Sequence, residues 1–491
     1  MMINCLRKRQ KHREIKKPTF YAILMTYLVG TLLLQSLFWI SPDHEQKIRM
    51  AYLWPSVIAV FIGLIWKTAV SRQNFGKAAV GFLIPVWLWI TCVLNGDPYL
   101  LYNHKFIMGI FLVFGICFPA FLCASPKQVN FGLKLVGYCA VTISTIVACL
   151  GIYATYENIQ VSSPFFDGIF GIVEGRLWVF LRHPNEVAVT FLATFLFAVY
   201  LAVDARHIAC KIILGICCIF LFAGIALTVS WTSKLALSVA LGLMTALFLM
   251  RFLRFGGREV RTMVICVLSI GVFALSILAL NKTIHVVSSA AVQNAQVKKI
   301  ATTAQEAIAH NEDVKDETHH MNTANGDVAM PQERDIIGNF ATFSGRTEIW
   351  ASGLNKIKQQ PRILLFGMTD GQAARVPLVL NREIYHMHNT WIEMLLLGGI
   401  PGVVLHLWFC VMVVIRCVCL FFAKNVKFSM RVLAIVPIAL LIICLMEIYP
   451  SFSGTTVDML FAMIAGAVLS ITTAELNSCR TGRECLVWSE M

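Results

Sequence analysis

Long apolar runs recur along this chain, with short polar segments between them, and they set the strongest limit on its fold. A helix needs about 20 apolar residues to cross a bilayer, because backbone N–H and C=O groups in hydrocarbon must bond to one another. We therefore predict an all-α polytopic membrane protein with about twelve transmembrane helices. The expected spans are approximately 19–40, 51–69, 78–95, 106–124, 131–153, 186–203, 212–229, 235–253, 263–280, 391–415, 432–449 and 456–473.

The composition excludes a water-soluble protein. Hydrophobic residues make up 58% of the chain and charged residues 14%, whereas soluble domains have about 45–50% apolar and about 25% charged residues. The formal net charge of +14 would suggest a nucleic-acid partner only if it gathered on one exposed face. The basic residues instead lie between apolar runs, so we expect membrane lipids as partners and no nucleic acid.

The basic residues also predict the orientation of the chain in the membrane. Lys and Arg concentrate in alternate connecting segments, which is typical of segments that stay in the cytoplasm. Placing the basic arm 1–18 inside makes both termini cytoplasmic. The first apolar run, 20–40, is long enough to span and is followed by no small-residue cleavage motif, so we expect no cleavable signal peptide.

This topology divides the chain into five parts. Residues 1–18 form the cytoplasmic arm, 19–280 the first nine spans, 281–390 a large outer loop, 391–473 the last three spans, and 474–491 a cytoplasmic tail. The first half of the loop, 288–330, is polar, and we expect it to be mobile or weakly helical. The second half, 332–389, has apolar residues at helical spacing around Trp350, so we expect it to be ordered.

Cysteine and histidine patterns predict neither disulfides nor a metal site. The chain has 16 cysteines, nearly all in apolar runs or basic segments, and none has the spacing of zinc ligands. We expect them to pack as small apolar residues. His386-x-His388 has no carboxylate or thiolate cluster beside it, so we expect no metal.

Short motifs near the end of the large loop carry the most specific functional signal. The first is Ser344-Gly345-Arg346-Thr347-Glu348-Ile349-Trp350, followed by Pro361 and Phe366-Gly367. The second is His388-Asn389-Thr390-Trp391-Ile392-Glu393, followed by Gly398-Gly399-Ile400-Pro401-Gly402. In this order they resemble the O-antigen ligase/polymerase family, where an Arg and a Trp open a periplasmic helix and a His-Asn pair enters a transmembrane helix with a Gly-x-Pro-Gly break.

Two earlier segments extend the resemblance. Arg182-His183-Pro184-Asn185-Glu186 is similar to the Pro-Asn pair that opens a transmembrane helix in the family. Where family members have a Ser-Arg pair at the outer end of a helix, this chain has Ser233-Lys234. Lysine supplies the positive charge but lacks the planar fork of arginine.

The resemblance implies a C-type glycosyltransferase-like architecture with a helix-containing periplasmic loop, in a multi-pass protein of the bacterial cytoplasmic membrane. It implies inverting, metal-independent transfer of a glycan from a polyprenyl (undecaprenyl) diphosphate carrier, without a cofactor. We expect lipid A-core as the acceptor. The motifs leave open a repeat-unit polymerase or a protein O-oligosaccharyltransferase. A glycolipid flippase or secondary transporter is less compatible with spans almost free of charge, to which Glu447 is the nearest exception.

The resemblance also suggests roles for single residues. We expect His388 and Arg346 to be catalytic, because an imidazole can take a proton from an attacking hydroxyl near neutral pH. Arg346 and Arg182 can bind phosphoryl oxygens bidentately as charge builds on them. Lys234 and Asn389 complete the expected diphosphate-binding set.

Simpler structural interpretations remain open beside these roles. His388 can be an interfacial histidine, Arg346 a solvated helix residue, and Arg182 a cation that reaches lipid phosphates. Thr390-x-x-Glu393 fits a capping box, so we expect Glu393 to be structural. The glycines and the proline at 398–402 are expected to permit a kink or a close helix contact.

Overall fold

The computed structural model describes only part of the chain. The described residues are 24, 27–30, 75–96, 110–162, 169–173, 175–179, 184–253, 258–309, 346–368, 376–377, 383–384, 387–423, 426–447 and 455–481. They divide between two compact units. Unit 1 comprises Met1–Phe38, His44–Ala140 and Trp350–Met491, and unit 2 comprises Trp39–Asp43 and Val141–Ile349.

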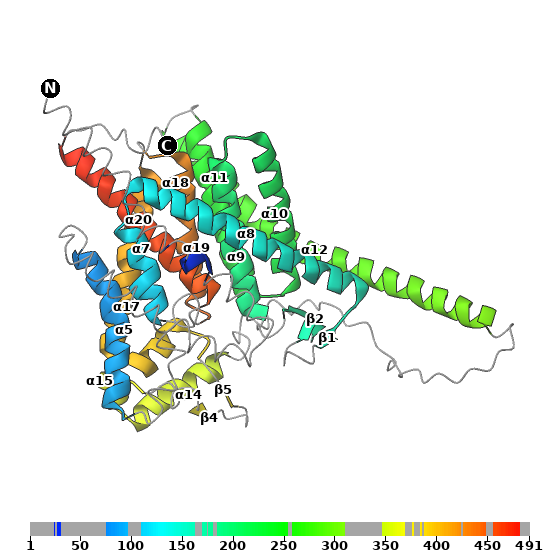
Figure 1. Ribbon diagram of the computed structural model, residues 1–491, viewed down its shortest axis with the longest axis horizontal. Helices are drawn as coiled ribbons and strands as arrows, with labels where there is room; N and C mark the ends of the chain where they lie inside the picture. The colour runs from blue at the N-terminus through cyan, green and yellow to red at the C-terminus, as the bar shows by residue number, and fades with distance from the viewer. Residues whose placement is uncertain are drawn as a thin grey trace, which may run out of the picture. The chain divides into compact units, whose positions relative to one another are not determined.

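Membrane-length helices dominate the described part of the chain (Figure 1). Eight helices there are long and apolar enough to cross a membrane, and two shorter apolar helices, Phe111–Leu122 and Phe428–Ile443, lie where we predicted further spans. The spans predicted at 19–40 and 51–69 lie almost entirely outside the described residues. The prediction of a polytopic α-helical membrane protein is therefore confirmed, and the number of twelve spans stays a prediction.

Unit 1 is built from helices that come from both ends of the chain. Its elements are α5 (Phe75–Leu94), the π-helical segment η2 (Phe111–Cys117), α7 (Phe118–Leu122), the start of α8 (Pro126–Glu157), most of α14 (Arg346–Gln359), α15 (Ile363–Phe366), β4 (Val376–Pro377), β5 (Glu383–Ile384), α17 (Thr390–Phe422), α18 (Phe428–Leu433), α19 (Ile435–Ile443) and α20 (Thr456–Thr481).

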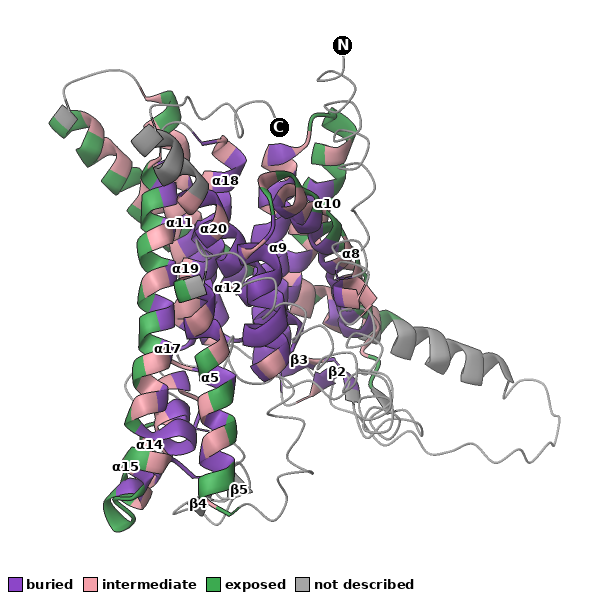
Figure 2. Ribbon diagram, turned by 60° about the vertical axis from the view of Figure 1, so that its left-hand side comes forward, coloured by how far each residue is buried: buried purple, intermediate pink, exposed green. Residues whose placement is uncertain are grey.

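Helix α20 supplies much of the core of unit 1. Of the residues in its span, 94% are buried, which identifies it as an interior helix rather than a lipid-facing one (Figure 2). The ring of Phe409 on α17 contacts Phe114, Phe118 and Phe461 edge-on, with centroid distances of 5.1, 5.0 and 6.2 Å. Four helical segments thus meet around one aromatic side chain, a favourable arrangement of ring quadrupoles.

Helix α17 is bent at Gly399, as the glycines and the proline predict. Gly399 has a φ of 62° and a ψ of −167°, and Pro401 follows inside the helix. The bend frees carbonyls that need other donors in a low-dielectric setting. Leu396 O accepts from the N–H of Met368 at 2.5 Å, Leu397 O from Thr91 Oγ1 at 3.2 Å, and Gly398 O from Trp87 Nε1 at 2.7 Å.

Unit 2 contains four long helices and a small sheet. Its elements are the rest of α8, β1 (Val161–Ser162), β2 (Ile169–Val173), β3 (Arg176–Trp178), α9 (Pro184–Asp204), α10 (Ile208–Leu227), α11 (Trp231–Phe252) and α12 (Arg258–Ala309). The antiparallel sheet has the order β1-β2-β3, with Val173 opposite Arg176. We did not predict these strands, because each is too short for an alternating pattern to be visible.

A small residue allows two helices of unit 2 to pack closely. A Cβ on Gly224 of α10 would lie 2.8 Å from the ring of Phe191 on α9, so these helices approach closely. Helix α10 instead exposes Ile208, Ile212, Ile216 and Ile219, which suits contact with lipid tails.

Helix α12 continues past the predicted end of its span to Ala309, so the first part of the predicted mobile segment is helical.

Candidate active site

His388 lies directly before α17 and has an unusual backbone conformation. Its φ is 47°, in the left-handed region that residues other than glycine rarely adopt. Such a conformation costs about 1–3 kcal/mol and persists where surrounding contacts fix it. The next residue, Asn389, supplies these contacts: its Oδ1 accepts from the N–H groups of Trp391 and Ile392, and its Nδ2 donates to Leu445 O at 2.9 Å.

The side chain of His388 contacts a buried carboxylate. Its Nδ1 lies 2.9 Å from Oε2 of Glu447, whose side chain is 1% exposed, while that of His388 is 22% exposed. Thr390 Oγ1 donates to the Glu447 carbonyl at 2.8 Å, and Thr390 N–H donates to Cys444 O at 3.0 Å. These bonds attach the start of α17 to the segment after α19.

The chemistry of this pair depends on where the imidazole carries its proton. An ionised Glu447 accepts a hydrogen bond from Nδ1–H, and the lone pair of a neutral imidazole is then on Nε2. A carboxylate in this position also fixes the orientation of the ring. The ring of His388 is therefore partly exposed, and buried Glu447 holds it on its Nδ1 side.

We did not predict a role for Glu447 from the sequence. It is 59 residues from His388, and no local motif connects the two. The sequence did place this carboxylate within a predicted apolar span. A carboxylate there is energetically costly and is by default a candidate functional residue.

The capping prediction for this helix is wrong by one residue. Asn389, not Thr390, is the N-cap of α17, because the Thr390 hydroxyl is used by Glu447 O. Glu393 is nevertheless structural, since its Oε2 accepts from the N–H of Met387 at 2.8 Å. Both polar atoms of Asn389 are bonded within the protein, so its predicted contact with diphosphate competes with a structural role.

Arg346 is the first residue of α14, the helix predicted around Trp350. Trp350 follows four residues later, which places the two side chains on the same helix face. Trp350 Nε1–H donates to the carbonyl of Met387 at 3.0 Å, and a Cβ on Gly353 would lie 2.8 Å from the sulfur of Met387. Helix α14 therefore packs against the residue directly before His388.

Unit 2 holds a second group of polar residues, of which Lys234 was predicted. Lys234 lies in the first turn of α11, is 5% exposed, and donates from Nζ to Asn281 Oδ1 at 2.9 Å. Arg182, the other predicted diphosphate ligand in this part of the chain, lies outside the described residues. Its role stays a prediction.

A buried arginine that we did not predict belongs to the same unit. Arg176 on β3 is 8% exposed, donates from Nε to Thr228 O at 2.9 Å, and donates from Nη2 to Asn185 Oδ1. It thereby connects β3 to the start of α9 and to the turn between α10 and α11. Val229 in that turn has a φ of 52°, a strained value for a β-branched residue. A basic residue within the apolar segment 169–180 was the only sequence signal.

No three His, Cys, Asp or Glu side chains in the described part of the chain lie close enough together to hold a metal ion. His386 lies outside that part.

The long apolar helices define a multi-pass α-helical membrane protein. The family model described as O-antigen ligase matches residues 216–407, which confirms the family resemblance of this chain. The matched range includes Lys234, Arg346, His388 and the bend at Gly399, and it excludes Arg176 and Glu447. The apolar helices and this family fit a protein of the bacterial inner membrane. No curated protein matches the chain.

Proposed function

We propose that the protein is an O-antigen ligase-like glycosyltransferase that moves a glycan from a polyprenyl diphosphate carrier to lipid A-core at the outer face of the inner membrane. The observation that carries the proposal is the bond between His388 Nδ1 and buried Glu447 Oε2, at 2.9 Å. The family match supports a ligase- or polymerase-type membrane enzyme. The direction of transfer and the acceptor are parts of the proposal.

In the proposed reaction, Nε2 of His388 takes the proton of an acceptor hydroxyl as its oxygen attacks the anomeric carbon. The bond between that carbon and the diphosphate oxygen breaks, and the leaving polyprenyl diphosphate keeps the electron pair. Attack opposite the leaving group inverts the anomeric centre. Glu447 keeps the imidazole oriented during the proton transfer.

The leaving diphosphate gains negative charge, so fixed cations near it lower the barrier. We assign this role to Arg346, Lys234 and Arg182, which act in place of a divalent cation. Lys234 is well suited to a fixed position, because Asn281 holds its ammonium group and the surrounding protein shields it from water.

The test is glycan transfer by the full-length protein in liposomes. The donor is a polyprenyl diphosphate-linked oligosaccharide, offered with lipid A-core, with excess donor alone, or with a periplasmic protein extract. The wild type is compared with His388→Ala and with His207→Ala, a matched control at an exposed histidine before α10. Circular dichroism and thermal unfolding check folding.

Transfer to lipid A-core that is lost in His388→Ala and retained in His207→Ala is the expected result. Lengthening of the donor glycan alone would make the protein a polymerase, and glycosylated protein would make it an oligosaccharyltransferase. Unchanged transfer by folded His388→Ala would overturn the catalytic assignment. Movement of donor across the bilayer without any transfer would favour the flippase.

A further inference from the structure

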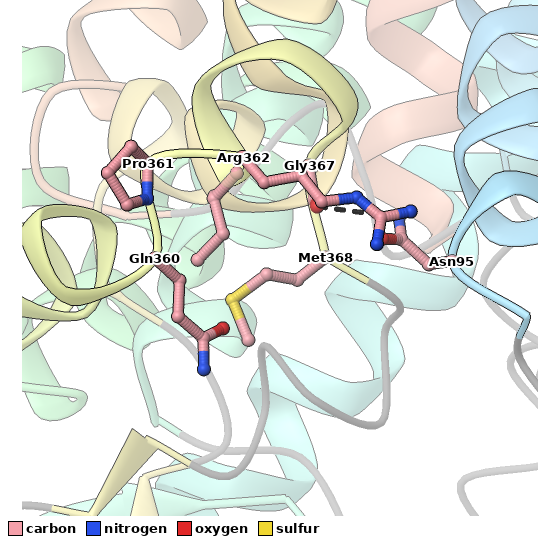
Figure 3. Close-up of a pocket in the computed structure, with 7 residues that line it drawn as sticks. Asn95, Gln360, Pro361, Arg362, Gly367 and Met368 are labelled. Atoms are coloured by element: carbon pink, nitrogen blue, oxygen red, sulfur yellow. Dashed lines mark hydrogen bonds between the residues drawn. The ribbon is translucent and has the colours of Figure 1, made fainter.

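A cavity in unit 1 lies where the turn between α14 and α15 meets the end of α5 (Figure 3). Its volume is about 390 Å³, within the range of ligand sites. The proposed transfer reaction uses none of its lining side chains. The lining residues are Asn95, Gln360, Pro361, Arg362, Ile363, Gly367 and Met368.

The walls of this cavity are held by specific bonds. Arg362 Nη2 donates to Leu94 O at 3.0 Å, and Asn95 Nδ2 donates to Phe366 O at 3.1 Å. Gly367 has a φ of 65°, and a Cβ there would lie 2.0 Å from Leu397 O. The turn therefore fits against α17 only with glycine at this position, which keeps the cavity preformed.

The cavity carries positive charge. Among the described residues that line the cavity, Arg362 has a charged side chain, and Asn95 and Gln360 add amide groups. Figure 3 shows the guanidinium of Arg362 beside Asn95, with Gln360 and Met368 across the cavity. A guanidinium has five N–H donors in a planar fork that matches phosphate, and the bond to Leu94 O uses one of its nitrogens.

The cavity also lies at the end of an exposed apolar surface. A Cβ on Gly399 would lie 2.8 Å from Leu364 O, so α15 sits at the level of the bend in α17. Apolar exposure on α17 begins at Ile400, directly after the bend. Helix α5 exposes a further apolar stripe that ends beside the cavity at Leu94, 46% exposed, and Leu365 of α15 is 58% exposed. The stripe on α5 consists of Leu83, Val86, Trp89, Val93 and Leu94.

We infer that this cavity binds the phosphate of an anionic membrane lipid. The predicted topology places the cavity at the outer leaflet, so the lipid comes from that leaflet. The phosphate bonds to Arg362, while the acyl chains lie along the apolar stripe of α5. Membrane lipids place a phosphate directly beside hydrocarbon, as the cavity and the stripe require. A soluble anion could bind Arg362 but would make no use of the adjacent apolar stripe. The inference does not depend on the transfer reaction.

The test uses full-length protein in phosphatidylethanolamine vesicles doped with diazirine-bearing phosphatidylglycerol. After illumination, labelled peptides are mapped by mass spectrometry. We expect label on the segments that contain Leu94 and Arg362. Arg362→Ala should reduce it about tenfold, the effect of losing a charge-assisted bond, and Arg362→Lys should reduce it less. Lys358→Ala, at an exposed cation of α14, should leave it unchanged.

Two competitions with wild-type protein keep the inference testable even if Arg362→Ala folds poorly. Excess unlabelled phosphatidylglycerol should remove the label, and excess inorganic phosphate should not. Equal labelling by a diazirine-bearing diacylglycerol, which lacks phosphate, would overturn the inference. Full competition by inorganic phosphate would also overturn it, because the site would then bind the free anion.

Discussion

Among the described residues, each unit has one residue other than glycine with a left-handed conformation next to the N-cap of a long helix, but the two units stabilise it differently. His388, with a φ of 47°, precedes the N-cap of α17, and Val229, with a φ of 52°, precedes the N-cap of α11. In unit 1 the N-cap Asn389 accepts two backbone N–H groups. In unit 2 the N-cap Ser230 makes no such bond, and the turn is held by buried Arg176 through Thr228 O.

The difference indicates two kinds of chemistry. Unit 1 pairs an imidazole with a carboxylate, an arrangement that moves a proton. Among the described residues of unit 2, the side chains of Arg176 and Lys234 are buried and held by bonds to Thr228, Asn185 and Asn281. Fixed cations suit a negatively charged substrate. If this difference holds, substitutions of the unit 1 pair His388 and Glu447 should lower kcat with little change in KM. Substitutions of the unit 2 cations should also raise the KM for the donor.

Removing the proposed base should have the largest effect. His388→Ala is expected to lower kcat by roughly 10²–10⁴-fold, the usual contribution of general acid–base catalysis. The KM for the donor should change little. Initial rates in liposomes measure both quantities. A large rise in KM with unchanged kcat would show that His388 binds substrate, which would contradict the proposed difference between the units.

Glu447 should matter less, because it acts through His388. Glu447→Gln keeps the size of the side chain but lets the amide bond to either tautomer, and we expect a loss of roughly 10–100-fold in kcat. Removing both groups should cost about as much as removing His388 alone, since they act as a unit. Additive losses in the double variant would contradict the pairing.

Sequence alone predicted those parts of the fold that local patterns encode. Apolar runs predicted the membrane helices, the helical spacing around Trp350 predicted α14, and the glycines with Pro401 predicted the bend at Gly399. The motifs also led to the family whose model matches residues 216–407. Each of these features arises within about one helix length of sequence.

Contacts between distant segments were not predictable in this way. Glu447 reaches His388 across 59 positions, and Arg176 reaches Thr228 across 52. The N-cap of α17 was misassigned because Thr390 fits a capping motif, while its hydroxyl bonds to Glu447 O in the fold. Such assignments depend on competing partners that a single segment does not contain.

A substitution of Arg176 tests whether the buried cations of unit 2 contribute to donor binding. Arg176→Ala removes the bonds to Thr228 O and Asn185 Oδ1, and we expect the KM for the donor to rise about tenfold, with a smaller change in kcat. Arg176→Lys should recover part of this loss, because the charge remains while the fork is absent. A fall in kcat alone would instead indicate that Arg176 acts on the chemical step, as proposed for His388.

The smallest expected effect concerns Asn389, which we predicted to bind diphosphate and which caps α17 in the structure. Asn389→Ala removes the acceptor for Trp391 and Ile392 and should destabilise the protein by about 1 kcal/mol, measured by thermal unfolding in detergent. Asn389→Asp keeps that acceptor and should retain more stability. The aspartate also adds a negative charge, which would strongly raise the KM for the donor at a true diphosphate contact. An unchanged KM would make Asn389 a positioning residue for His388, and a raised KM would restore the prediction from sequence.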